Sequence, residues 1–300
     1  MRGLPKIQQL QVFQAIIQHG SIRAAAKALD QSQPGITRSL QELEQKVGAV
    51  LVIRGGGGVI LTGAGIMFKT RMELVLNELN RALDEVEHLN NLTSGTVAMG
   101  LSSLAILTLL PAALREFKKT NQKSSIFNRE GQANELLPAL QSGELDFIMV
   151  RAIPSEYLSG LVQEPLFKTS FKVYARKGHP LARCTSLAQL QDADWYLPVT
   201  AMRQCNPLES LLFNSPDKAV MRGTVNAVLQ MVLHADYLTV VPKAMVRAHF
   251  LAQNLGIIPV KERLPDVEYC LVYSSERPIT QAARSLMDAF HLESQQHAWG

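Results

Sequence analysis

The sequence predicts three parts in order: a helical module with a β-hairpin, one long helix, and an α/β body of two open-sheet subdomains. Three observations predict this division. All of the net charge of +4 lies in residues 1–65 of the 300, which hold seven basic and three acidic side chains. Residues 66–91 contain neither Pro nor Gly and repeat apolar residues in steps of four and three. From residue 95 onward, strand-like apolar runs alternate with helical patterns.

The composition narrows the class of protein. Apolar residues make up 47% of the chain and charged residues 19%, which excludes a disordered or collagen-like chain. The three cysteines are far apart and odd in number, so they predict no disulfide framework and fit a reducing compartment. The first 20 residues lack the apolar run of a secretion signal. The long uncharged stretch 96–114 is broken by Gly100 and Pro111, so we expect a cytoplasmic protein without a membrane span.

The first two helices are marked by their ends. Apolar residues recur at helical spacing over residues 10–17, and Gly20 follows where a left-handed terminal residue is needed. Ser21 then caps a short helix over residues 22–29. Residues 24–26 are all alanine, so a third helix can cross this one closely.

A third helix is predicted from Ser32, its N-cap, to Gly48, which ends it. Pro34 lies in its first turn, where a missing N–H costs nothing. Its inward stripe consists of Ile36, Leu40, Leu43 and Val47. Its outer side presents Gln33, Thr37, Arg38 and Gln41.

This helix, tight turn and helix can serve DNA recognition. A helix fits the major groove of B-form DNA, where Gln pairs with adenine and Arg with guanine edges or phosphate. The alternative is a plain helical bundle with a solvated polar face. Two capped short helices, an alanine-rich crossing and local positive charge together favour DNA.

The segment after Gly48 predicts a β-hairpin. Two β-rich runs, residues 51–54 and 59–62, flank four glycines. Such a hairpin is the usual wing beside a helix-turn-helix, and Arg54 is placed to reach a phosphate or the minor groove. A phosphate-cradling glycine loop is disfavoured because no GK[ST] sequence follows.

These motifs together resemble the N-terminal winged helix-turn-helix of LysR-type transcriptional regulators. The family pattern is matched by Ser21 with Ala25 and Ala26, by Ser32-Gln33-Pro34, by Leu43-Glu44, by Leu51 to Arg54, and by Leu61-Thr62 with Gly65. There are two departures: Val52 replaces the usual Phe, and Gly57 stands where many members carry a basic wing residue. The DNA-binding set expected from the pattern and the resemblance is Arg23, Ser32, Gln33, Pro34, Thr37, Arg38 and Arg54.

The connector predicts a pairing helix. Its apolar residues, spaced as heptads, are Met72, Leu76, Leu79, Leu83 and Val86. The alternative is one amphipathic helix packed on its own domain. In LysR-type regulators this segment is the linker helix that dimerises. The resemblance therefore implies a homodimer, assembling to a homotetramer, on double-stranded DNA with an interrupted inverted repeat, with RNA polymerase as a further candidate partner.

The body is predicted to hold two β/α units. Strands are expected at residues 96–101, 124–128, 147–150, 171–175, 195–198, 238–241 and 269–273. Helices are expected at residues 105–120, 134–141, 187–190, 225–233, 243–251 and 279–290. The body is similar to the LysR-type effector domain, a hinged pair of Rossmann-like subdomains related to periplasmic binding proteins. The resemblance implies chain crossings near residues 165 and 266; a turn at residues 234–237 departs from the glycine-containing turn of many members.

Polar residues at the strand ends predict a ligand site. Ligands of open α/β sheets bind beyond the carboxyl ends of the strands, where hydroxyls, helix N-termini and Arg side chains bind anions. Each residue alone is equally explained by helix capping or a surface ion pair. The resemblance implies an inducer, often an organic or amino acid, around Ser102, Thr200 and Thr224. The expected effector-binding set is Ser102, Ser103, Gln132, Arg151, Thr200, Arg203, Thr224 and Asn226.

The expected domains are residues 1–65 for DNA binding, 66–91 for the linker helix and 92–300 for effector binding. Within the last, subdomain I comprises residues 92–165 and 266–300, and subdomain II residues 166–265.

Two rival functions stay open. Seven histidines show no HxxxH spacing and no CxxC exists, so we expect neither metal nor cofactor. An α/β enzyme is disfavoured, although a Ser/His/Asp set is assembled in space rather than in sequence. A thiol-based redox sensor is the second rival, because Cys184 and Cys205 fall in one subdomain. We expect a DNA-binding regulator controlled by a small, anionic effector.

Overall fold

The computed structural model describes residues 3–55, 58–89, 95–198, 220–247, 251–297 and 299. The chain forms two compact units: residues 1–90 with 141–144, and residues 91–140 with 145–300. None of the described helices is long and apolar enough to cross a membrane.

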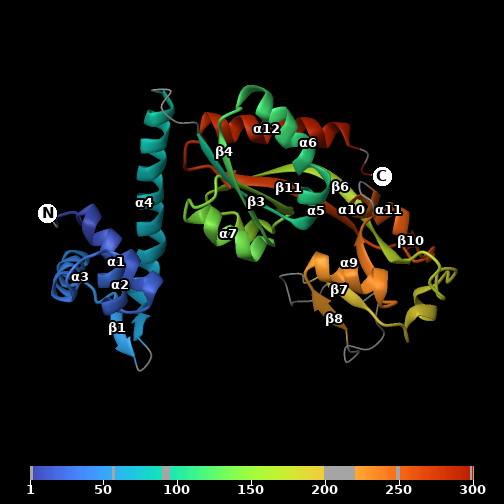
Figure 1. The fold of residues 1–300 in the computed structure, drawn as a ribbon, viewed down its shortest axis with the longest axis horizontal. Coiled ribbons are helices and arrows are strands. Elements are labelled where there is room, and N and C mark those ends of the chain that lie inside the picture. Colours follow the sequence, from blue (N-terminus) through green and yellow to red (C-terminus); the bar gives the residue numbers. More distant parts are fainter. Residues whose placement is uncertain are drawn as a thin grey trace. The chain divides into compact units, whose positions relative to one another are not determined.

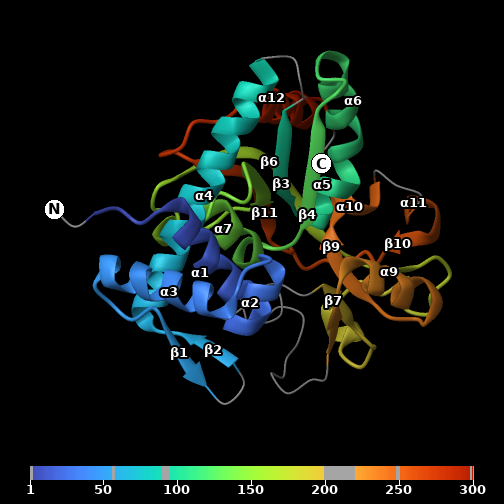
Figure 2. The same cartoon turned by 60° about the vertical axis from the view of Figure 1, so that its left-hand side comes forward.

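The first unit is a helical module with a β-hairpin and one long helix (Figures 1 and 2). Its elements are α1 (Ile7–His19), α2 (Ile22–Ala28), α3 (Gln33–Val47), β1 (Val52–Gly55), β2 (Gly58–Leu61) and α4 (Gly63–Leu89). The core is formed by fully buried residues of α1 and α3, such as Phe13 and Ile36, and by Leu51 before the hairpin. The inward stripe predicted for the third helix is confirmed at Ile36, Leu40 and Leu43.

The predicted helix ends are confirmed. Gly20 (φ +68°) and Gly48 (φ +79°) adopt the left-handed conformation that ends α1 and α3. The Ser21 Oγ accepts a hydrogen bond from the Ala24 N–H at 3.1 Å, which caps α2. The Ser32 Oγ caps α3 in the same way by accepting from the Gly35 N–H.

The heptad seam predicted for the long helix is wrong at its start. Met72 is 2% exposed and belongs, with Leu76, to the core of the first unit. Beyond its first turns, α4 exposes the apolar side chains of Val75, Leu79, Leu83 and Val86. Packing of the first turns on α1 takes precedence there over the heptad spacing, so the solvent-facing stripe is displaced from the predicted one.

The second unit contains a seven-stranded sheet with helices on both faces. Its first half and closing segment are β3 (Thr96–Leu101), α5 (Ser103–Thr108), α6 (Leu110–Thr120), β4 (Ser125–Glu130), α7 (Ala133–Gln141), β5 (Phe147–Arg151), β6 (Leu161–Arg176), β11 (Asp266–Ser274) and α12 (Gln281–Gln296). The strand order is β10-β6-β11-β5-β3-β4, with β9 also paired to β6. Helices α6 and α12 cover one face and α7 the other (Figure 1). The carboxyl ends of the parallel strands β3, β4 and β5 therefore share one edge.

The other half packs around the far end of β6. It contains η2 (Leu187–Leu190), β7 (Tyr196–Pro198), β8 (Met221–Gly223), α9 (Val225–His234), β9 (Thr239–Pro242), α10 (Lys243–Arg247), α11 (Leu251–Asn254) and β10 (Leu255–Ile257). A short helix, η1 (Ser155–Tyr157), precedes β6. Residues Leu161–Ser170 of β6 pair with β11, and residues further along pair with β9 and β10. One strand thus runs through both halves.

The predicted boundaries differ from the structure at several elements, of which three concern the second unit's packing. The helix expected over residues 105–120 is two helices, because Pro111 has no N–H to continue the first. Of the helix expected over residues 243–251, the structure describes Lys243–Arg247 as α10, and α11 begins at Leu251. The strand expected at residues 171–175 is the end of the 16-residue β6. In β6, Leu166 lies between Pro165 and Phe167, which pair with consecutive residues of β11, so a β-bulge interrupts the ladder there.

The unusual turn at residues 234–237 has a local explanation. Asp236 adopts φ +58°, a conformation in which Asp is tolerated better than most side chains. The Arg176 Nε donates to its carboxylate. That hydrogen bond holds the pKa of Asp236 below its usual range.

Candidate functional site

Helix α3 presents the residues that are predicted to contact DNA bases on one exposed face, which we call the reading face. A shallow hollow of about 380 Å³ is lined by Gln33, Pro34, Thr37, Arg38 and Gln41. The opposite side of the helix is buried in the core of the first unit. The structure therefore brings four residues of the predicted DNA-binding set together, with Gln41 added.

Hydrogen bonds within α3 orient this face. The Ser32 Oγ accepts from the Gly35 N–H at 3.3 Å, so it is engaged as a helix cap. The Thr37 hydroxyl donates to the Gln33 carbonyl at 3.0 Å. The Arg38 Nε donates to the Glu42 Oε1 at 3.0 Å, while the Gln33 and Gln41 side chains are exposed.

The two remaining predicted DNA contacts lie on other elements. Arg23 is exposed on α2. Arg54 lies in β1, opposite Val59 of β2, and its side chain lies outside the described residues. Gly57, which stands where many family members carry a basic wing residue, also lies outside the described residues.

The carboxylate of Glu44 ties α3 to the hairpin. Its Oε1 accepts from the N–H of Leu51 at 2.7 Å and of Val52 at 3.3 Å. This explains why a Leu-Glu pair stands in the motif: Leu43 fills the core while Glu44 satisfies two backbone donors.

The junction between hairpin and α4 explains the Leu-Thr-x-x-Gly motif. The Thr62 hydroxyl donates to the Val50 carbonyl at 2.7 Å and accepts from the Gly65 N–H at 3.0 Å. A Cβ on Gly65 would lie 2.0 Å from the Leu51 carbonyl oxygen, so only glycine fits. The motif thus fixes the wing against the long helix.

The hairpin is also held to the turn between α1 and α2. The Val59 N–H donates to the Gly20 carbonyl at 2.9 Å. Gly58 has φ +136°, and a Cβ there would lie 2.5 Å from the same oxygen. These contacts orient the wing relative to α3.

Two residues near the reading face escaped the sequence reasoning. Gln9 is a buried polar residue in the core of the first unit, and Glu42 is its partner on α3. The signal was present: Gln9 stands four and seven residues before Phe13 and Ile16, on the apolar face of α1. A polar side chain at such a position requires a partner.

In the second unit, Ser102 follows β3 at the predicted sheet edge. Its N–H donates to the Met149 carbonyl at 2.9 Å, and the residue is 4% exposed. Ser102 occupies the N-cap position of α5, but its hydroxyl makes no capping bond, so the alternative interpretation of this hydroxyl as a helix cap does not apply. Among the described residues the buried Ser102 Oγ has no hydrogen-bond partner.

The neighbours of Ser102 in the predicted set are engaged differently. The Ser103 hydroxyl donates to Glu130 at 2.5 Å, and the backbone N–H of Gln132 donates to Glu135 at 2.9 Å. Arg151 ends β5 with an exposed side chain.

The rest of the predicted effector set lies in the other half. Thr224 caps α9 through a 3.3 Å hydrogen bond from the Ala227 N–H, as the simple capping interpretation expects, and Asn226 is exposed beside it. Thr200 and Arg203 lie outside the described residues.

The two described cysteines, Cys184 and Cys270, lie in apolar surroundings. Cys270 is buried, which raises the pKa of its thiol to about 11. Cys184 packs, half-buried, against an apolar cluster, and Cys205 lies outside the described part of the chain. Over that described part, no group of three His, Cys, Asp or Glu residues could hold a metal ion.

Two family models match the chain. "Bacterial regulatory helix-turn-helix protein, lysR family" matches residues 7–66. "LysR substrate binding domain" matches residues 90–294.

Relatives and solved structures agree with these matches. The HTH-type transcriptional regulator TdcA of Escherichia coli K12 is 33% identical over 95% of this chain and 92% of its own length. The crystal structure of CbnR, a LysR family transcriptional regulator, has a TM-score of 0.70 at 18% identity, covering 96% of this chain and 99% of that one. Full-length CbnR complexed with its target DNA gives 0.68 at 19%, covering 97% and 99%. The chain belongs to the LysR family of DNA-binding transcriptional regulators and carries the family's effector-binding domain.

Proposed function

We propose that this regulator reads double-stranded DNA with an interrupted inverted repeat through the exposed face of α3. The observation that carries the proposal is the hollow in which Gln33, Thr37 and Arg38 lie together with Pro34 and Gln41. Amide and guanidinium groups recognise adenine and guanine edges in the major groove. Arg23 and Arg54 supply flanking phosphate contacts, and Ser32 holds the helix end that approaches the DNA.

A binding selection from random duplexes tests this proposal. We expect an enriched site with two-fold symmetry, and loss of about 1–3 kcal/mol of binding free energy at one position of that site for Arg38→Ala. Arg115→Ala, in the second unit, is the matched control for loss of one positive charge. An unsymmetrical or absent consensus, or unchanged binding by Arg38→Ala, contradicts the assignment.

The exposed stripe of α4 supports pairing of two chains. Val75, Leu79, Leu83 and Val86 leave an apolar band in solvent along one helix, and a second copy of this band covers it as in a coiled coil. We propose a homodimer through this stripe, and a homotetramer of two dimers.

Sedimentation tests the pairing. Leu83→Asp, which places a charge on the stripe, is expected to shift the chain toward monomer, whereas Glu73→Ala on the same helix leaves the assembly unchanged. A dimer that withstands Leu83→Asp at micromolar concentration refutes this interface.

The effector proposal rests on Ser102. A buried hydroxyl without a partner among the described residues is costly unless a ligand uses it. We propose that a small organic or amino acid binds between subdomain I (residues 92–165 and 266–300) and subdomain II (166–265). The remaining proposed contacts are Ser103, Gln132, Arg151, Thr200, Arg203, Thr224 and Asn226.

Thermal-shift screening with small carboxylic acids and amino acids tests the effector. A ligand at 100 times its Kd adds about 2.7 kcal/mol to the free energy of unfolding. We expect Ser102→Ala to remove that shift and Ser155→Ala, outside the site, to keep it. The ligand controls DNA binding only if it favours one arrangement of the paired chains.

The proposal keeps the division into domains at residues 1–65, 66–91 and 92–300. It also includes a cytoplasmic location, because the DNA target lies in that compartment. RNA polymerase is the proposed further partner at the promoter. A Cys184→Ser/Cys205→Ser double variant that still responds normally to oxidant rules out thiol sensing.

A further inference from the structure

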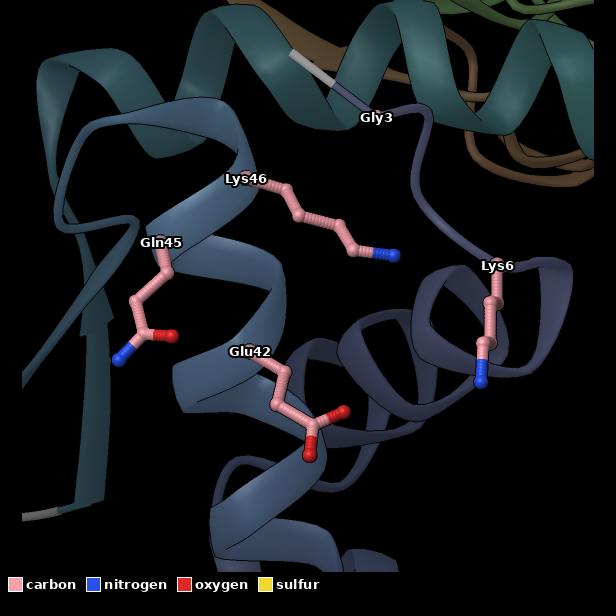
Figure 3. A pocket seen from close by; sticks show the side chains of 5 residues that line it. All are labelled: Gly3, Lys6, Glu42, Gln45 and Lys46. Atoms are coloured by element: carbon pink, nitrogen blue, oxygen red, sulfur yellow. The ribbon is translucent and has the colours of Figure 1, made fainter.

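A second hollow lies between α3 and the start of α1. It has a volume of about 440 Å³ and is lined by Gly3, Lys6, Glu42, Gln45 and Lys46. Figure 3 shows Lys46 extending its ammonium from α3 into this space, with Glu42 on the same helix and Lys6 on the far side. Both signs of charge therefore meet beside the reading face.

Gln9 links these groups from beneath. The residue is 4% exposed, and its Nε2 donates to the Glu42 Oε2 at 3.0 Å. Its Oε1 accepts from the Lys6 N–H at 3.0 Å and from the Lys46 Nζ at 3.4 Å. Because donors face the oxygen and an acceptor faces the nitrogen, the amide has one favoured orientation.

The chain of hydrogen bonds ends at the reading residue. Glu42 divides its two oxygens: Oε2 is held by Gln9, and Oε1 accepts from the Arg38 Nε at 3.0 Å. The Arg38 side chain is 83% exposed. Engagement through Nε leaves its two terminal nitrogens available, and those nitrogens form the two-pronged contact with a guanine edge.

We propose that Glu42, anchored by Gln9, is a positioning residue that sets the direction of Arg38 for base recognition. The inference rests on the proposed contact of Arg38 with DNA. An exposed ion pair four residues apart on a helix is weak when both side chains must be ordered. Gln9 already orders the Glu42 carboxylate, so binding has only Arg38 left to order.

A different role for Glu42 predicts the opposite sign. A carboxylate beside the DNA backbone repels phosphate, and its removal then strengthens binding to every sequence alike. Positioning instead affects the preference for the correct site. The ratio of affinities for the selected site and for a scrambled duplex of equal length, at one salt concentration, separates the two because uniform effects cancel in it.

The experiment measures this ratio in the full-length chain and five variants, each checked for an unchanged melting temperature. We expect Glu42→Ala and Gln9→Leu to lower the ratio about two- to fivefold, as coupled neighbours do. In an Arg38→Ala background, Glu42→Ala is expected to change nothing further. Gln45→Ala, which alters the same hollow, is the control and keeps the ratio.

A double variant supplies the rescue. Gln9→Glu combined with Glu42→Gln preserves an acceptor for Lys6 and Lys46, a donor between the pair, and an acceptor for Arg38. We expect this double variant to restore the ratio that Glu42→Ala lowers. Because position 42 then carries no charge, such a rescue shows that the hydrogen bonds, and not the charge beside Arg38, set the ratio.

The outcomes separate this inference from the proposed function. If Arg38→Ala lowers the ratio but Glu42→Ala does not, the positioning role is overturned and the DNA contact stands. The same conclusion follows if Glu42→Ala lowers the ratio as much in the Arg38→Ala background as in the unaltered chain. If Arg38→Ala leaves the ratio unchanged, the contact itself is overturned and positioning with it.

Discussion

Replacement of Glu44 tests how α3 holds the wing. Glu44→Ala removes the acceptor of two backbone donors, the N–H groups of Leu51 and Val52. Leu51 is fully buried, so its N–H cannot turn to water instead. A hydrogen bond to a charged group contributes about 1.5–3 kcal/mol, and the longer bond at 3.3 Å adds less. We expect a loss of about 2–4 kcal/mol in the local free energy of unfolding.

The milder Glu44→Gln isolates the charge. Its amide oxygen still accepts both bonds, now as neutral hydrogen bonds of about 0.5–1.5 kcal/mol each. We therefore expect it to recover roughly half of the loss seen with alanine. Glu73→Ala, which removes a partly exposed pair with Lys69 at 3.7 Å, is the matched control and costs less than about 0.5 kcal/mol.

Hydrogen exchange of the full-length chain, followed by mass spectrometry, is the suitable assay because its peptides separate the hairpin from the rest of the chain. Peptides that cover residues 50–61 are expected to exchange faster in Glu44→Ala, and peptides from the second unit are not. Protection within 0.5 kcal/mol of the unaltered chain, a tolerance of about twofold in rate, refutes the reasoning that this carboxylate secures the wing.

Three further predictions follow from other contacts. Gly65→Ala is expected to cost at least about 1–3 kcal/mol, because its Cβ meets the Leu51 oxygen, whereas Gly63→Ala, with open space around it, is tolerated; chemical denaturation measures both. Burial raises the pKa of Tyr269 from 10.0 to about 12, so the free energy of unfolding is constant in this respect below pH 10 and falls by about 2–3 kcal/mol as the pH rises from 10 to 12. Tyr269→Phe flattens that fall, and an unchanged slope in alkaline denaturation contradicts it. Asp236→Ala is expected to cost about 1 kcal/mol in thermal unfolding and Asp236→Gly less than 0.5, because only glycine adopts φ +58° freely; equal costs exclude backbone strain.

The helix ends of the first unit could be predicted because each depends on one local residue. Gly20, Ser21, Ser32 and Gly48 act through backbone conformation or a hydrogen bond within three residues, and such effects are visible in a sequence window. Which side of α4 packs against its own unit could not be predicted in this way. Whether Met72 faces a partner or its own unit depends on packing against α1, which spacing alone does not encode.

The candidate site divides along the same line. The reading face of α3 follows from helical periodicity, so Gln33, Thr37 and Arg38 could be placed on one side. The contact between Gln9 and Glu42 spans 33 residues and depends on how two helices cross. In the second unit, periodicity located Ser102 at a strand end, but it could not show that the hydroxyl is buried without a partner there.

The bulge at Leu166 has a mechanical consequence. Because β6 continues as one strand for 16 residues through both halves of the second unit, no loop separates the halves at this crossing. A change in their angle therefore bends and twists this strand, and the extra residue between Pro165 and Phe167 is where its ladder is already interrupted. Such a joint stores elastic energy as it deforms and returns when released. We therefore expect the effector to change the unit by small, graded rotations, with the length of the strand amplifying them at its ends.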